Sequence, residues 1–306
     1  IEIGESDRDP VFTITDLLPH LAKDQMEKKM SEGVTGEGLN ILVGSYPAKK
    51  GAEKDKIKEA IKTILKSKYD IEDDDFVSAE LQLVPAMKAR EIGFDRSLIG
   101  GYGQDDRSCA FASVRAILEV KKPEHTALCV IADKEEIGSV GNTGLRSYFL
   151  ENAVADLVNK AGVKDYFQVM QALRSSHALS ADVNGALDPN YEGVFEKLNS
   201  SIIGEGISLT KYTGSRGKYD ASDANPEFVA RIRRLFDENE VTWQVGELGK
   251  VDQGGGGTVA QFLARYGMEV LDCGVALLGM HSPYEVVSKA DLFATYKAYK
   301  VFMQNF

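Results

Sequence analysis

Carboxylates and an imidazole stand beside apolar runs at four places in this 306-residue chain. The segment at 103–107 precedes a buried-helix pattern, and the segments at 133–139, 180–183 and 279–282 each follow an apolar run. Open α/β sheets bind ligands beyond the carboxyl ends of their strands. Side chains of these types, brought together there, would suit zinc, manganese or cobalt. The candidate site residues are Asp105, Glu135, Glu136, Asp182 and His281.

Each placement also has an ordinary explanation. Asp105 with its two neighbours could form a helix cap and an ion pair, and Glu135 with Glu136 could be a charged loop. Asp182 could cap a turn, and His281 could be a hydrogen-bonded core histidine. Taken singly, none of these signals specifies a site. Their order along the chain and their shared context favour one.

Composition and charge narrow the class of protein. Hydrophobic residues make up 43% of the chain and charged residues 27%, which is ordinary for a globular enzyme. The net charge of −11 disfavours nucleic-acid binding, which needs a basic face. Cys109, Cys129 and Cys273 are too few and too far apart for a disulfide framework, so they indicate a reducing compartment. No membrane span or signal-peptide pattern is present, and we expect a cytoplasmic enzyme.

The periodicity of apolar residues predicts the elements that must position these side chains. Helices are expected at 55–69, 108–120, 152–161, 226–239 and 288–302, and strands at 76–84, 126–132 and 270–280. Strands that alternate with helices predict an α/β fold with a doubly wound, mostly parallel sheet. We place a domain boundary near residue 98. Residues 1–98 are expected to form a smaller, strand-rich domain, and residues 99–306 the α/β domain.

Several motifs together resemble the dinuclear metallo-aminopeptidases, most closely the aspartyl-aminopeptidase-like branch. They agree over about 200 residues, which makes the resemblance specific. The first part of the chain is similar to the family's inserted assembly domain, and its best marker is DLLPHL at 16–21. The other matching stretches are DKEEIGS (133–139), SAD (180–182), DPNY (188–191), GELGKVD (246–252), GGGGT (254–258) and MHS (280–282).

The resemblance implies two divalent metal ions, zinc above all, with cobalt or manganese as alternatives. It implies that Asp105 bridges both ions, in a register that sets it apart from the adjacent Asp106. Glu136 and His281 would complete one ion's protein ligands, and Asp182 would bind the other. The remaining glutamate, Glu135, would be the general base, which holds the attacking water and passes its proton to the leaving amine.

One part of the family pattern is missing from this chain. The family supplies a further ligand from an upstream His-x-Asp segment, and none of His20, His125 and His177 has that context. The chain also begins at Ile1, without an initiator methionine. We therefore expect the upstream histidine to come from a segment of a longer polypeptide.

Five residues are candidates for contact with substrate. The glycine run with Thr258 lacks the Lys-Ser/Thr of a phosphate-binding loop. In the family it would let a peptide approach the backbone, although it could also be a plain flexible loop. Lys211 opens a basic segment that could meet an acidic substrate side chain or simply be solvated. His20 could reach a neighbouring subunit's active site or have a structural role. The candidates are Gly255, Gly256, Thr258, Lys211 and His20.

The leading hypothesis is a metal-dependent aminopeptidase that removes the N-terminal residue of peptides, assembled as a homo-oligomer, by resemblance a dodecamer. A second hypothesis keeps the metal chemistry in an amidase, deacylase or carboxypeptidase. A third is an inactive assembly subunit. Retention of both Glu135 and Glu136 disfavours the third, because a scaffold has no need of a base beside a ligand. Neither nucleic acid nor membrane is expected as a partner.

Overall fold

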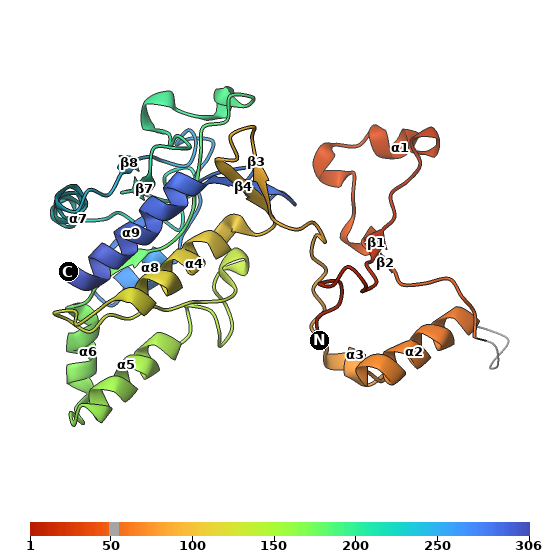
Figure 1. Ribbon diagram of the computed structural model, residues 1–306, viewed down its shortest axis with the longest axis horizontal. Coiled ribbons are helices and arrows are strands. Elements are labelled where there is room, and N and C mark those ends of the chain that lie inside the picture. Colours follow the sequence, from red (N-terminus) through yellow and green to blue (C-terminus); the bar gives the residue numbers. More distant parts are fainter. Residues whose placement is uncertain (49–54) are drawn as a thin grey trace. The chain divides into compact units, whose positions relative to one another are not determined.

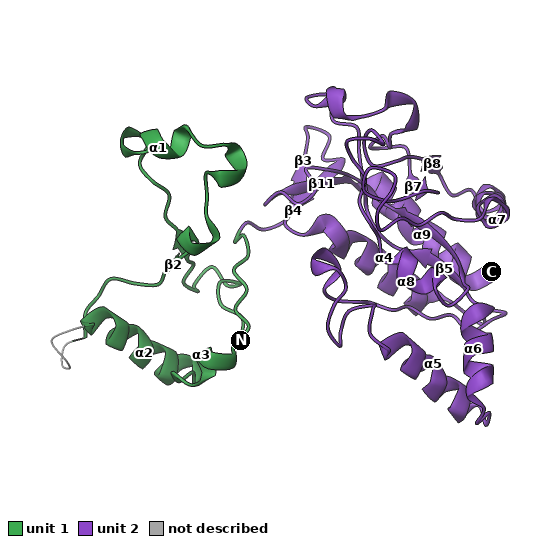
Figure 2. Cartoon of the chain, turned by 180° about the vertical axis from the view of Figure 1, so that it is seen from behind, with its two compact units in different colours: residues 1–86 green, residues 87–306 purple. Residues whose placement is uncertain are grey.

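The chain folds into two compact units, which the computed structural model describes for residues 1–48 and 55–306. Unit 1 is Ile1–Ala86 and unit 2 is Met87–Phe306 (Figure 2). The sequence places the boundary near residue 98. The structure places it earlier because strand β3 (Arg90–Ile92) pairs antiparallel with β4 (Leu98–Gly101) and so belongs to the sheet of unit 2.

Unit 1 has little regular structure and is not strand-rich. Its short strands β1 (Thr13–Ile14) and β2 (Ile41–Leu42) pair antiparallel. The helix predicted at 55–69 is confirmed, but the strand predicted at 76–84 is wrong, since residues 75–78 form a helical turn and residues 79–84 form no strand. An alternating pattern forms a strand only where another strand offers hydrogen bonds. The helices of unit 1 are α1 (Lys23–Met26), α2 (Lys56–Tyr69), α3 (Asp75–Ser78) and the 3₁₀ turns Pro19–Leu21, Met30–Glu32 and Gly36–Gly38 (Figure 1).

Unit 2 contains two sheets, with strand orders β3-β4-β11-β10-β6 and β5-β9-β7-β8. The α/β class is confirmed, but the sheets are less parallel than predicted. The pairs β6–β10, β5–β9 and β7–β8 are parallel, and the remaining pairs are antiparallel. The further strands are β5 (His177–Ser180), β6 (Asn184–Gly185), β7 (Ile207–Thr210), β8 (Trp243–Val245), β9 (Glu269–Gly274), β10 (Ala276–Leu278) and β11 (Glu285–Ser288).

Two apolar runs of unit 2 that were predicted as single strands have other structures. The run predicted as one strand at 270–280 forms β9 and β10, which lie in different sheets and connect them through the buried Val275. The strand predicted at 126–132 is not found. Only Asp133 beyond it makes an isolated bridge, to Gly144, and the side chains of Leu128 and Ile131 are exposed. No described strand offers this run a ladder of hydrogen bonds.

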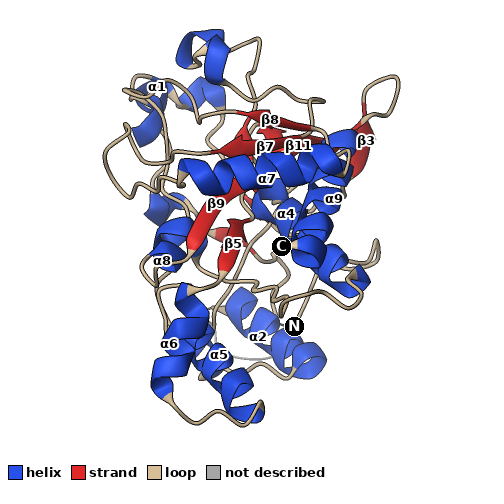
Figure 3. Cartoon of the chain, turned by 90° about the vertical axis from the view of Figure 1, so that its left-hand side faces the viewer, coloured by secondary structure: helices blue, strands red, loops and turns tan. Residues whose placement is uncertain are grey.

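The predicted helices of unit 2 are confirmed; α4, α7 and α9 pack on the sheets, whereas α5 packs on α6 (Figure 3). Helix α4 packs along α9, while α7 packs on β9 and α9 on β7. Phe228, Ile232 and Phe236 recur every four residues along α7, so they fall on one face and fill the core with Tyr299. The helices are α4 (Gln104–Glu119), α5 (Phe149–Lys160), α6 (Tyr166–Arg174), α7 (Pro226–Glu238), α8 (Ala260–Ala264) and α9 (Lys289–Asn305).

Removing part of this core tests the packing. Ile232 is fully buried, so Ile232→Ala should lower the free energy of unfolding by about 2–5 kcal/mol through lost burial and a cavity. Arg234→Ala, at an exposed position of the same helix, should change it by less than about 0.5 kcal/mol. Urea unfolding followed by circular dichroism measures both. Equal effects of the two substitutions would contradict this packing.

Candidate metal centre

Three of the candidate ligands follow strands of the two sheets of unit 2. Strands β4 and β10 run in the same direction, because each pairs antiparallel with β11 between them. Asp105, in the first turn of α4, follows β4, and His281 follows β10 by three residues. Both therefore lie at the same edge, as the sequence predicts. Asp182 follows the end of β5 by two residues.

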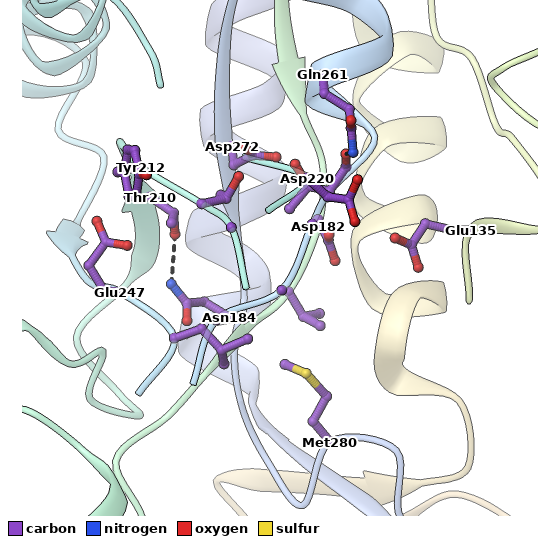
Figure 4. A pocket seen from close by; sticks show the side chains of 18 of the residues that line it. Glu135, Asp182, Asn184, Thr210, Tyr212, Asp220, Glu247, Gln261, Asp272 and Met280 are labelled. Carbon is purple, nitrogen blue, oxygen red and sulfur yellow. Dashed lines mark hydrogen bonds between the residues drawn. The ribbon is translucent and has the colours of Figure 1, made fainter. Parts of the chain in front are cut away.

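All five predicted site residues of this group line one pocket of about 520 Å³. Glu135 and Glu136 enter it from a 3₁₀ turn, Glu135–Ile137. Figure 4 shows Glu135 and Asp182 facing the same space from opposite segments of the chain. The pocket also contains Gly255, Gly256 and Thr258. The structure thus brings together most of what the sequence singled out.

Three of these side chains form a compact ligand set. The Nε2 atom of His281 lies 3.0 Å from Oδ2 of Asp105 and 3.1 Å from Oε1 of Glu136. One potential ligand atom from each of the three lies within 4.8 Å of the others. Two carboxylates and one imidazole at this spacing match the ligand chemistry of zinc. The set fits a divalent cation.

A second set shares Asp105 with the first. Ligand atoms of Asp105, Asp106 and Asp182 also lie within 4.8 Å of one another. Asp105 is therefore the one residue common to both sets, which is the position that a bridging carboxylate needs. Oδ1 of Asp106 is buried without a hydrogen-bond partner. A buried, unpaired carboxylate oxygen is costly, and a cation would relieve that cost.

The electrostatics of this cluster favour a cation. Burial raises the pKa of Asp105 to about 6, the charge of Glu136 adds to the rise, and His281 opposes it. Burial also raises the pKa of Asp182, and the carboxylates of Asp106 and Asp272 raise it further. These shifts have the two causes that make a carboxyl group hard to ionise, desolvation and like charge. A divalent cation would favour the ionised carboxylates and so lower these pKa values.

Glu135 differs from the ligand sets. It lines the pocket but belongs to neither group of clustered ligand atoms. Burial raises the pKa of Glu135, and the charges of Glu136 and Asp105 add to the rise. A carboxylate with a raised pKa is a stronger proton acceptor. Its position therefore sets Glu135 apart from the two ligand sets, while its raised pKa is a property that Asp105 shares.

The glycine run packs against another loop of the same unit. Gly255 has a φ of +85°, and a Cβ there would lie 2.1 Å from the carbonyl oxygen of Gly214. Backbone hydrogen bonds join Gly214 to Gly256 and Arg216 to Gly254, both at 2.9 Å. The run is thus a hydrogen-bonded wall of the pocket, and glycine is required because two backbones approach closely.

Two predicted substrate contacts are not placed in the pocket. Lys211 does not line it; its Nζ donates to Oδ1 of Asp223 at 2.5 Å, while its neighbours Thr210 and Tyr212 do line it. His20 belongs to unit 1, in the 3₁₀ turn Pro19–Leu21. Among the described histidines that line the pocket, His281 stands alone. The predictions for His20 and Lys211 stay predictions.

Sequence reasoning missed several polar residues of this region. Asn184, Glu247 and Asp272 line the pocket, and burial raises the pKa of Glu247 to about 7. Glu285 is buried beside the ligands and bonds to their backbones. Asp272 and Glu285 are each a polar residue inside a strand, and that pattern alone does not indicate what the side chain contacts.

Zinc should stabilise the folded protein. Because the unfolded chain lacks this ligand geometry, zinc at about 100 times its dissociation constant should add about 2.7 kcal/mol of stability. Differential scanning fluorimetry after chelation and zinc readdition measures the change in melting temperature. His281→Ala should abolish most of that change, while His177→Ala, outside the pocket, should keep it. An unchanged shift in His281→Ala would exclude His281 as a ligand.

The profile of the aminopeptidase I zinc metalloprotease (M18) family matches residues 1–303. A probable M18 family aminopeptidase 1 from Clostridium acetobutylicum is 55% identical over 303 residues, which cover 99% of this chain. The chain spans 65% of the length of that relative.

No described helix is long and apolar enough to cross a membrane.

Solved structures agree with these relationships. The crystal structure of an M18 aminopeptidase from Thermotoga maritima superposes with a TM-score of 0.96 at 49% identity, covering 100% of this chain and 67% of that one. The structure of an S. cerevisiae mApe1 dodecamer, 22% identical, shares the fold with a TM-score of 0.65, covering 97% of this chain and 63% of that one. With a family profile that spans nearly all of its residues, the chain belongs to the M18 family of aminopeptidase I zinc metalloproteases.

Proposed function

We propose that this chain supplies most of the active site of a metal-dependent aminopeptidase that releases the N-terminal residue of peptides. Two divalent ions, zinc or alternatively cobalt or manganese, would be bound. Asp105 would bridge them, Glu136 and His281 would bind one, and Asp182 the other. The observation that carries the proposal is that the two clustered sets of ligand atoms have Asp105 in common.

The second set lacks a nitrogen ligand. It consists of carboxylates alone, Asp105, Asp106 and Asp182. We propose that an upstream histidine completes it, in keeping with the family resemblance and with the chain's span of 65% of its relative. The full reading frame would then carry the whole ligand set. Activity is accordingly a property proposed for the complete protein.

The residues of this chain divide the chemistry among them. Bound zinc ions supply Lewis-acid activation of water and of the peptide carbonyl. Glu135 takes the proton of the attacking water and delivers it to the leaving amine, a role that suits its raised pKa. The glycine wall with Thr258 lines the pocket on the side where the peptide backbone would lie. An amidase, deacylase or carboxypeptidase could use the same core, and substrate profiling separates these activities.

Changing the proposed base and the proposed ligand should have different effects. Glu135→Gln should keep metal content but lower kcat by roughly 10²–10⁴, because proton transfer is lost. Glu136→Ala should lower metal content itself. Metal analysis and hydrolysis of aminoacyl p-nitroanilides by the complete protein measure both. Glu238→Gln, on an exposed part of α7, is the control. Nearly full turnover in Glu135→Gln would refute its role as base.

We further propose a homo-oligomer, by resemblance a dodecamer, in which unit 1 makes subunit contacts. Among the described hydrophobic residues of unit 1, Ala22 alone is buried. Leu21 is 71% exposed and Met30 100% exposed. Apolar surface of this extent marks an interaction site. His20, next to Leu21, would lie near a neighbouring chain. The three free cysteines agree with a cytoplasmic location.

Light scattering on the complete protein tests the assembly. We expect a particle of many subunits at micromolar concentration, and Leu21→Glu should shift it towards smaller species because a charge would be buried in the contact. Arg234→Glu, at an exposed and already charged position of unit 2, should leave the mass unchanged. A monomeric wild-type protein would exclude the oligomer while leaving the metal site unaffected.

A further inference from the structure

Glu285 is a buried carboxylate that bonds to the backbones of two proposed metal ligands. It is the first residue of β11 and is 2% exposed. Its Oε2 accepts a hydrogen bond from the backbone N–H of Asp105 at 3.1 Å, and its Oε1 accepts one from the backbone N–H of His281 at 2.8 Å. One side chain thus connects two segments that are far apart in the sequence.

The topology places Glu285 where both ligand segments arrive. Because β11 runs antiparallel to β4 and β10, it begins at the edge where those two strands end. Glu285 is paired with Gly101, the last residue of β4. Glu285 is the residue of β11 that lies at that edge, and the rest of the strand runs away from it. A long acceptor side chain at this position can therefore reach the backbone that follows each neighbouring strand.

Both N–H groups belong to backbone that cannot satisfy them locally. Asp105 is the second residue of α4, where helical N–H groups lack an acceptor within the helix, and its ψ of 108° departs from helical geometry. His281 has a φ of +64°, in the left-handed region that residues with a side chain seldom adopt. An outside acceptor is needed to hold each conformation.

We infer that Glu285 is a positioning residue, which fixes the separation of Asp105 and His281 and so presets the cation site. The inference rests on the proposed function. The side chains that it would align lie 3.0 Å apart, from Oδ2 to Nε2. Groups behind the ligands orient them, and removing such groups weakens metal affinity. The role needs two acceptors and no donor, which a carboxylate provides and an amide does not.

The competing explanation is that Glu285 only braces the ends of the strands. The chain offers a matched control for that case. Asp291 is fully buried, and its two oxygens accept the backbone N–H groups of Gly204 at 2.6 Å and Gly206 at 2.8 Å. It makes the same kind of double contact, but it bonds to no proposed ligand and does not line the pocket.

The experiment compares Glu285→Gln with Asp291→Asn in the complete protein. Zinc affinity is measured by competition with a chromophoric chelator, the visible spectrum is recorded with Co²⁺, and the melting temperature is taken without metal. Glu285→Gln should weaken zinc binding by about 10–100-fold and change the Co²⁺ spectrum. Asp291→Asn should lower the melting temperature but leave affinity and spectrum unchanged. Glu285→Asp, which keeps both acceptors on a shorter arm, should recover part of the affinity.

Wild-type zinc affinity in Glu285→Gln, or an equal loss in Asp291→Asn, would overturn this inference alone. A wild-type protein that binds no zinc would overturn the proposed function as well. Should Glu285→Gln fail to fold, Glu285→Asp decides the matter. Weakened zinc binding in Glu285→Asp together with unchanged binding in Asp291→Asn supports the positioning role, and undiminished binding in Glu285→Asp rejects it.

Discussion

Partly buried carboxylates repel one another, and unit 2 places three of them with ligand atoms within 4.8 Å. Burial and like charge raise the pKa values of Asp105 and Asp182, so the ionised cluster is costly without a cation. The fold accepts this cost at the edge where strands β4 and β10 end. The backbone bonds to Glu285 and the hydrogen-bonded glycine wall keep that edge in place, so a cation would meet ligands that are already arranged.

Local signals pointed to much of the candidate site, and the family resemblance supplied the roles of its residues. An acid or histidine directly after an apolar run is visible in a few residues, as at Asp182 and His281. Glu285 and Asp272 were not predicted as site residues. Each belongs to a strand, and a single polar residue in a strand does not indicate which groups it contacts. The contacts of Glu285 with Asp105 span 180 positions of the sequence, and only the topology reveals them.

The helices were predictable for a similar reason. Their hydrogen bonds are internal, so a period of three to four apolar residues nearly defines them, as in α7. A strand forms only beside another strand, and the apolar pattern of the sequence does not identify that neighbouring strand. The runs at 76–84 and 126–132 have apolar sequences but no ladder in the described structure. The boundary was misplaced in the same way, since β3 belongs with β4 only through pairing.

The ion pair of Lys211 bears on whether this residue could bind an acidic substrate. Its ammonium group pairs with Asp223 and not with the pocket, yet both side chains are substantially exposed. An exposed ion pair contributes only about 0–1 kcal/mol, so exchanging one carboxylate partner for another costs little. The observed pair therefore does not remove Lys211 from substrate binding. Its neighbours Thr210 and Tyr212 line the pocket, so the backbone of Lys211 lies directly beside it.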